Sequence, residues 1–153
     1  MPPAAFIVFG VLLGIIAFAI LNLANGVEWD CAASTNTGTF TRSSDCTISG
    51  TGNTDGGGVD VTGTLEIVGS STDMDNLVTI SAASKKRHFY VNGANDKLVL
   101  RYVKLVGGDV SSSSGGSIYI RNGGEVQLYS CIVSNNEAKY GGGIYPRGSS
   151  SSS

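Results

Sequence analysis

The chain has 153 residues, which is enough for one domain, and its hydrophobic content of 41% can support a core. Charged residues make up only 14% of the sequence and glycine occupies 22 positions, a composition that favours a turn-rich all-β chain over a helical one. The formal net charge of −2 gives no reason to expect nucleic acid as a partner.

Residues 1–26 are dominated by an apolar run, because positions 4–24 carry no charged side chain. A helix of that length would span about 31 Å, close to the hydrocarbon thickness of a bilayer. A secretory signal peptide cleaved near Gly26 is the alternative, but the run is long for a signal and no basic residue precedes it. We therefore expect an N-terminal apolar helix that is a transmembrane anchor, contacting the membrane through residues 4–24, or a signal peptide. Both place the rest of the chain outside the cytosol, membrane-anchored or secreted to the cell surface.

Residues 27–58 are predicted to form an N-terminal cap, which a solenoid needs because an open end exposes strand edges and apolar core. Within this segment, Cys31 and Cys46 flank a short polar stretch. A disulfide between them would stabilise the fold by about 3 kcal/mol and would suit an oxidising compartment, and we predict that it forms. No CxxC pattern or neighbouring histidine suggests a metal, and we predict neither a metal site nor a cofactor.

Residues 59–148 are predicted to form the coils of the fold. Apolar residues alternate through 59–69, and a period of two indicates strands with one buried face. Residues 77–80 and 88–91 are expected to be further strands, so that 59–96 makes a divergent first coil or coil and a half.

The segment 97–145 contains an internal repeat. KLVLRYVKLVGGDVSSSSGGSIY at 97–119 is followed by EVQLYSCIVSNNEAKYGGGIY at 125–145. At an offset of 28, the apolar residues Leu98, Leu100, Val103 and Leu105 align with Val126, Leu128, Cys131 and Val133, whereas Ile118 aligns with Ile144 at an offset of 26. A repeat of this length is typical of a solenoid, whose units cannot bury their own apolar face alone. Each copy is expected to hold two short strands, a loop and a third strand, which predicts a parallel β-helix of about three to four coils.

The turns of the repeat agree with this fold. Gly107-Gly108 is replaced by Asn135-Asn136, and because both residue types tolerate positive φ, the exchange predicts a left-handed corner. Ser111–Ser114 is expected to be an exposed loop, and Cys131 a small core residue. The serine tail, residues 149–153, cannot cover the end of a β-helix, so we expect either a fragment of a longer solenoid or another chain that covers that end.

The segments GGSI (115–118), GGGI (141–144) and IVSN (132–135) resemble the GGAI and FxxN repeats of chlamydial polymorphic outer membrane proteins. They are also similar to right-handed parallel β-helix surface proteins with the pectin-lyase-like fold. The resemblance covers roughly residues 59–148 and departs at Ile132, where the FxxN motif has Phe. It implies a right-handed parallel β-helix displayed at a cell surface.

Three polar clusters are candidates for chemistry. Asp73, Asp75 and Asn76 could hold Ca²⁺, but they lack the glycine and terminal glutamate of an EF-hand loop, and a solvated loop explains them better. The basic run 85–88 could meet an anionic polysaccharide or lipid head group, although charged loop residues between strands are ordinary. His88, the only histidine, has no identifiable partner for base catalysis and is expected to begin a strand. We therefore assign no catalytic residue.

Tyrosines recur near strand positions, namely Tyr90, Tyr102, Tyr119, Tyr129, Tyr140 and Tyr145. Outward rings could stack on sugars or contact a partner protein, or could serve only as strand formers on a half-exposed sheet. The expected function is therefore that of an exported, surface-displayed module with a structural or adhesive role, binding a glycan or a protein through its outer β-face. No individual binding residue follows from the sequence.

Two alternatives remain open. The chain could be a fragment of a polysaccharide lyase or hydrolase with the pectin-lyase-like fold, but such enzymes display acidic and basic residues on one face across coils, and Arg101 and Lys104 become Tyr129 and Ile132 in the second copy. It could also be a small single-span subunit of a larger membrane complex, in which Trp29 would lie at the membrane interface.

Overall fold

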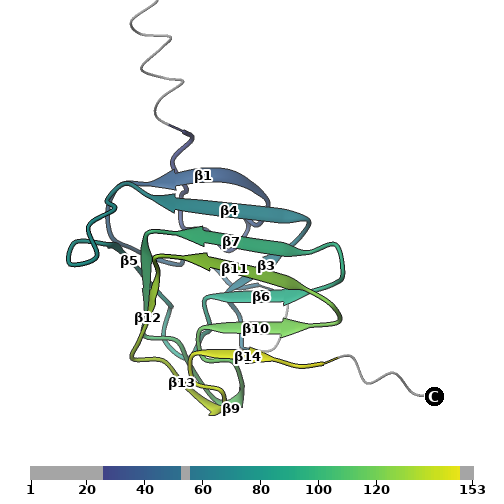
Figure 1. Cartoon of the computed structure of the whole chain (residues 1–153). Coiled ribbons are helices and arrows are strands. Elements are labelled where there is room, and N and C mark those ends of the chain that lie inside the picture. The colour runs from purple at the N-terminus through teal and green to yellow at the C-terminus, as the bar shows by residue number, and fades with distance from the viewer. Residues whose placement is uncertain (1–25, 53–55, 149–153) are drawn as a thin grey trace, which may run out of the picture.

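The computed structural model describes residues 26–52 and 56–148, and all regular structure in these residues is β-strand. The strands wind into a parallel β-solenoid of about four coils, stacked from β1 toward β14 (Figure 1). The coils comprise, in order, β1 (Gly38–Arg42), β2 (Cys46–Thr47) and β3 (Val59–Val61); β4 (Thr64–Gly69), β5 (Val78–Ser81) and β6 (Phe89–Asn92); β7 (Lys97–Arg101), β8 (Val103–Val106), β9 (Asp109–Ser114) and β10 (Ile118–Arg121); and β11 (Glu125–Tyr129), β12 (Ile132–Val133), β13 (Glu137–Tyr140) and β14 (Ile144–Pro146).

Strands at the same place in successive coils pair in parallel. They form three four-stranded sheets, β1-β4-β7-β11, β2-β5-β8-β12 and β3-β6-β10-β14, and a two-stranded ribbon, β9-β13. Leu100 lies opposite Leu128, and Ile118 lies opposite Ile144. The offsets of 28 and 26 residues predicted from the repeat are therefore the registers of the sheets, and the predicted parallel β-solenoid is confirmed.

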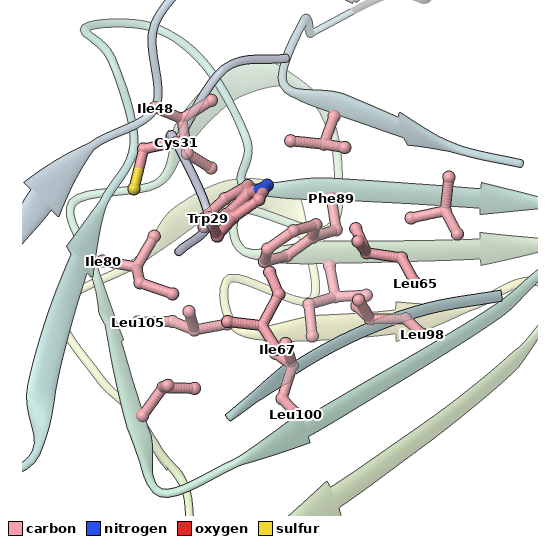
Figure 2. Close-up of a cluster of buried hydrophobic side chains, with 14 of the residues drawn as sticks. Trp29, Cys31, Ile48, Leu65, Ile67, Ile80, Phe89, Leu98, Leu100 and Leu105 are labelled. Carbon is pink, nitrogen blue, oxygen red and sulfur yellow. The ribbon is translucent and has the colours of Figure 1, made fainter. Parts of the chain in front are cut away.

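Inward-facing side chains of the three sheets meet in one apolar core (Figure 2). Leu98 and Leu100 of the third coil are fully buried, whereas Val126 and Leu128, their partners in the fourth coil, are only partly buried. Full burial of such a side chain contributes about 1.5–3 kcal/mol, so the second and third coils hold most of the hydrophobic stabilisation. Cys131 also packs against this core, as predicted.

The corner after the second strand of the third and fourth coils is left-handed, as the glycine-to-asparagine exchange predicts. Gly107 has φ +76° and Asn135 has φ +53°, and the Gly107 amide donates to the Asn135 carbonyl at 3.0 Å. The neighbouring exchange, of Gly108 for Asn136, has a different structural cause. A Cβ on Gly108 would collide with the Gly116 carbonyl, and the Asn136 side chain instead accepts a hydrogen bond from the Gly108 amide at 2.7 Å.

A partial rung, residues 26–33, covers the first coil. The Trp29 amide donates to the Thr41 carbonyl at 2.8 Å, and the indole is fully buried with its ring 6.0 Å from the ring of Phe89. Trp29 thus fills the end of the core, next to Ile48 (Figure 2). The interpretation of Trp29 as a membrane-interface residue is wrong, because an interfacial indole would be exposed outside the folded core.

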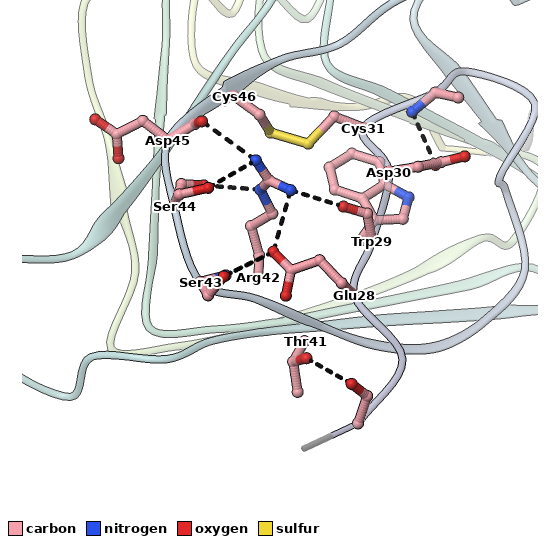
Figure 3. Close-up of polar contacts among 12 residues, drawn as sticks. Glu28, Trp29, Asp30, Cys31, Thr41, Arg42, Ser43, Ser44, Asp45 and Cys46 are labelled. Carbon is pink, nitrogen blue, oxygen red and sulfur yellow. Dashed lines mark hydrogen bonds and ion pairs between the residues drawn. A yellow bond between two sulfur atoms is a disulfide. The ribbon is translucent and has the colours of Figure 1, made fainter. Parts of the chain in front are cut away.

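Polar contacts and a disulfide fasten this rung to the first coil (Figure 3). The predicted disulfide between Cys31 and Cys46 is present and joins the rung to β2. The Arg42 guanidinium donates to Glu28 at 3.1 Å and to the Trp29 carbonyl at 3.0 Å. A disulfide is compatible with the predicted oxidising, extracytoplasmic location.

Two predicted elements are corrected. The N-terminal apolar helix, residues 4–24, lies outside the described residues, and the described ranges contain no helix, so the fold class shown is a β-solenoid alone. Accordingly, no helix capable of crossing a bilayer is found in residues 26–52 and 56–148. Ser111–Ser114 is not a loop but part of β9, because β9 pairs with β13 of the next coil and Ser114 lies opposite Tyr140.

Candidate functional site

A groove of about 410 Å³ runs along the outer face of the sheet β3-β6-β10-β14, beside the ribbon β9-β13. We call it the tyrosine–arginine groove. The described residues that line it are aromatic, basic or hydroxyl-bearing: Tyr90, Ser112, Ser113, Ser114, Tyr119, Arg121, Lys139, Tyr140 and Arg147.

Two glycines shape this groove. Gly115 (φ +67°) follows β9 and Gly141 (φ +58°) follows β13, at the point where each coil turns from the ribbon into the sheet. A Cβ on Gly115 would lie 2.9 Å from Cβ of Tyr119, and one on Gly141 would lie 3.0 Å from Cβ of Tyr145. Glycine is needed at both positions, because only it combines this φ with so close an approach. The first glycine of each GGxI segment therefore sets the bend beside the tyrosines.

Three tyrosines form a row across three coils. Tyr90, Tyr119 and Tyr145 occupy equivalent outward positions in β6, β10 and β14. Their ring centroids are separated by 5.4 Å and 5.7 Å, and the ring of Tyr140 lies 6.4 Å from that of Tyr145. Tyr90 and Tyr119 are nearly buried, whereas Tyr140 is 53% exposed. The row therefore forms a packed floor, and Tyr140 is the aromatic ring that a ligand can reach.

Three basic side chains lie around this floor. Arg121 ends β10, and Arg147 follows β14 in the next coil, where its amide donates to the Ile120 carbonyl at 2.8 Å. Lys139 belongs to β13 and its ammonium lies 5.3 Å from the centre of the Tyr140 ring. A hydrogen bond to the Tyr119 hydroxyl raises the pKa of Arg147 above its usual value, so Arg147 stays charged.

The groove differs in charge from the opposite sheet, β1-β4-β7-β11. There, Lys97 pairs with Glu125 at 3.0 Å and Arg101 pairs with Glu66 at 3.0 Å. Within the described part of the chain, the three groove cations have no such acidic partner, and no carboxylate lines the groove. The groove is thus a local excess of positive charge on a chain whose formal net charge is negative.

Arg87 lies beneath the groove rather than in solvent. It is fully buried, it donates to the Ser114 carbonyl at 2.7 Å, and its guanidinium stands 4.9 Å from the centre of the Tyr119 ring. These contacts connect β9 to the tyrosine row. Only half of the basic run 85–88 can form the cationic surface considered from the sequence, because Arg87 and His88 are buried, whereas Lys85 is exposed and Lys86 is partly exposed.

His88 immediately precedes β6 and is fully buried. Its Nε2 lies 3.0 Å from the Val106 carbonyl and 3.1 Å from the Ile80 carbonyl, and its Nδ1 lies 3.1 Å from the Ser117 hydroxyl. Carbonyls only accept, so Nε2 carries the proton and Nδ1 accepts from Ser117. Burial lowers the pKa of His88 to about 4, partly opposed by its hydrogen bonds to the two carbonyls. His88 thus links neighbouring coils and is neutral near neutral pH.

The remaining sequence candidates do not join the groove. Asp73, Asp75 and Asn76 lie in the exposed segment between β4 and β5, where Asn76 donates to Asp73 at 2.7 Å and this bond lowers the pKa of Asp73. In the part of the chain that the structure describes, no group of three acidic, histidine or cysteine side chains could hold a metal ion. Tyr129 is on the opposite sheet, 4.0 Å from the guanidinium of Arg101.

Sequence reasoning missed Arg121 and Arg147, although a signal was present. They are 26 residues apart, the offset that also relates Ile118 to Ile144 and Tyr119 to Tyr145. Applying the repeat offset to outward positions, and not only to apolar ones, would have found a paired arginine and tyrosine on one face.

Comparison with known proteins adds no further assignment. No protein-family model, no curated protein and no solved structure matches this chain significantly.

Proposed function

We propose that this chain is an exported, surface-displayed β-solenoid module that binds a glycan in the tyrosine–arginine groove and so has an adhesive or structural role. The observation that carries the proposal is the alignment of the groove residues on successive coils. Equivalent side chains of neighbouring strands repeat about every 4.8 Å, so Arg121 and Arg147 of successive coils are regularly spaced beside the tyrosine floor, which suits a ligand that is itself a repeating chain.

The surface chemistry favours a glycan over a protein partner. The exposed large hydrophobic residues among those described, Val27, Met74, Tyr129 and Tyr140, are scattered and form no apolar centre of the kind that protein interfaces use. The groove instead combines one accessible ring, Tyr140, with the serine hydroxyls of β9 and the basic side chains. An aromatic platform surrounded by hydrogen-bonding groups suits the apolar face and the hydroxyls of a sugar.

Export is supported by the disulfide that ties the first rung to β2. Such a bond persists where thiols are oxidised, outside the cytosol, and glycans of a wall or matrix are present in the same place. A right-handed, pectin-lyase-like solenoid of this kind would act as a rigid rod that displays the groove.

The test is a glycan array probed with the full-length chain in mild detergent. Wild-type protein should bind a defined set of polysaccharides, and Tyr140→Ala should lower the affinity for them at least about tenfold, because the accessible ring is lost. The matched control is Tyr129→Ala, which removes a comparably exposed tyrosine from the opposite sheet. Binding to no glycan, or equal losses in the two variants, would reject the proposal.

A further inference from the structure

The positive charge of the groove indicates which class of glycan it would bind. This inference rests on the proposed function. Three cations elsewhere in the described chain pair with carboxylates, as Arg42 does with Glu28 at 3.1 Å. Arg121, Lys139 and Arg147 converge on one groove that no described carboxylate lines. Three positive charges held close together repel one another, and an anionic ligand would relieve that repulsion.

The arrangement of the arginines indicates what kind of anion fits. Arg121 and Arg147 come from successive coils, next to Tyr119 and Tyr145 respectively in register, so their guanidinium groups can each meet one unit of a chain running along the solenoid. Guanidinium donors match the paired oxygens of a carboxylate or a sulfate ester better than an ammonium does. Lys139 faces the same space from β13 and adds a less directional charge.

The row of equivalent positions also sets a limit. In the first coil, the position of the tyrosines is taken by Asp60, which lies opposite Tyr90. Among the described coils, the tyrosine row and the basic side chains around it therefore belong to the second, third and fourth coils only.

We propose that the tyrosine–arginine groove binds an acidic polysaccharide, with Arg121 and Arg147 as the residues that contact its oxyanions. The oxyanion can be the carboxylate of a uronic acid or a sulfate ester, since both offer the same oxygen geometry to a guanidinium. Tyr140 supplies the ring against which the sugar packs, and Lys139 strengthens the attraction.

The test measures affinity of the full-length chain for three probes: polygalacturonate, which carries carboxylates, dextran sulfate, which carries sulfates, and neutral dextran. Wild type should bind at least one acidic probe in preference to dextran, and the affinity should fall as salt is added, because screening weakens exposed charge interactions. Arg147→Gln should lower this affinity about tenfold, and R121Q/R147Q further, because charge-assisted hydrogen bonds are lost. The acidic probe that binds identifies the anion.

The control is K85Q/K104Q, which removes the same amount of charge from residues that do not line the groove. If this control weakens binding as much as R121Q/R147Q, general attraction explains the result and the inference is wrong. It is equally wrong if dextran binds as well as the acidic probes and the arginine variants bind normally, an outcome that leaves glycan binding itself intact. A failure of every glycan, on the array and here, would instead overturn the proposed function together with this inference. Circular dichroism and the fluorescence of Trp29 check that each variant is folded.

Discussion

Lowering the pH should destabilise the folded solenoid through one buried group, His88. Its ordinary pKa is 6.5 and burial lowers the pKa to about 4 in the folded chain. The unfolded state therefore takes up a proton first as the pH falls through 6.5, and the stability that is fully present above this value is lost progressively until the folded state is protonated near pH 4. The sign is the same as for a carboxyl group with a lowered pKa, because in both cases acid favours the unfolded chain.

The size of the effect follows from the two pKa values. Proton linkage gives a loss of about 2 kcal/mol between about pH 7.5 and about pH 5, and about 3 kcal/mol in total at lower pH. The chain contains one histidine, so no other imidazole titrates in this window. Asp30 and Asp73 also have lowered pKa values, but their ordinary value is 3.8, and their contribution is lost mainly below the window.

The assay is urea unfolding at several pH values, followed by the fluorescence of Trp29, with His88→Gln as the comparison. Glutamine can donate to a backbone carbonyl but does not titrate, so the variant should be less stable at neutral pH and nearly independent of pH in the window. An NMR titration of His88 in wild type should show no protonation above about pH 5. The reasoning is refuted if His88 titrates near its ordinary pKa in the folded protein, or if the variant keeps the wild-type pH dependence.

Three further predictions concern stability measured by urea unfolding. Reducing the disulfide between Cys31 and Cys46 should cost about 3 kcal/mol, because the unfolded chain gains freedom, and an unchanged midpoint would contradict this. Leu100→Ala should cost about 3 kcal/mol, and Leu128→Ala, in register but only partly buried, about half as much; equal costs would show that the fourth coil packs as tightly as the third. Asn135→Gly should change stability by less than about 0.5 kcal/mol, whereas Asn135→Val should cost at least about 1 kcal/mol at φ +53°, and the reverse order would rule out a left-handed corner.

The parallel solenoid could be predicted because its signal is periodic. Apolar side chains repeat every second residue along a strand and again at each coil, so Leu100 and Leu128 could be aligned from the sequence and are paired in the sheet. The disulfide was predicted from two cysteines that flank a short polar segment, in a chain expected from its sequence to be exported. In both cases, the residues that form the contact could be identified from their spacing and type in the sequence.

Features that depend on contacts distant in sequence could not be predicted in the same way. Nothing local marks Trp29 as a core residue, since its burial depends on Phe89, sixty positions later. From the sequence, Arg87 would be expected to lie in solvent. Its burial depends on contacts with the carbonyl of Ser114 and the ring of Tyr119, which are distant in the chain. The groove was missed because it is built from outward positions, where the apolar pattern carries no information.

The disulfide on the first rung affects where unfolding of the solenoid begins. Coils in such a stack contact only their neighbours, so structure is lost from the ends rather than from the middle. The covalent bond between Cys31 and Cys46 prevents the rung 26–33 from peeling away before the first coil opens. Among the described coils, we expect the fourth to open before the second and third, because Leu128 and its neighbours are only partly buried. Reduction of this disulfide would allow unfolding to begin at the rung 26–33 as well. The redox state therefore determines whether the N-terminal side of the solenoid can open independently of the fourth coil.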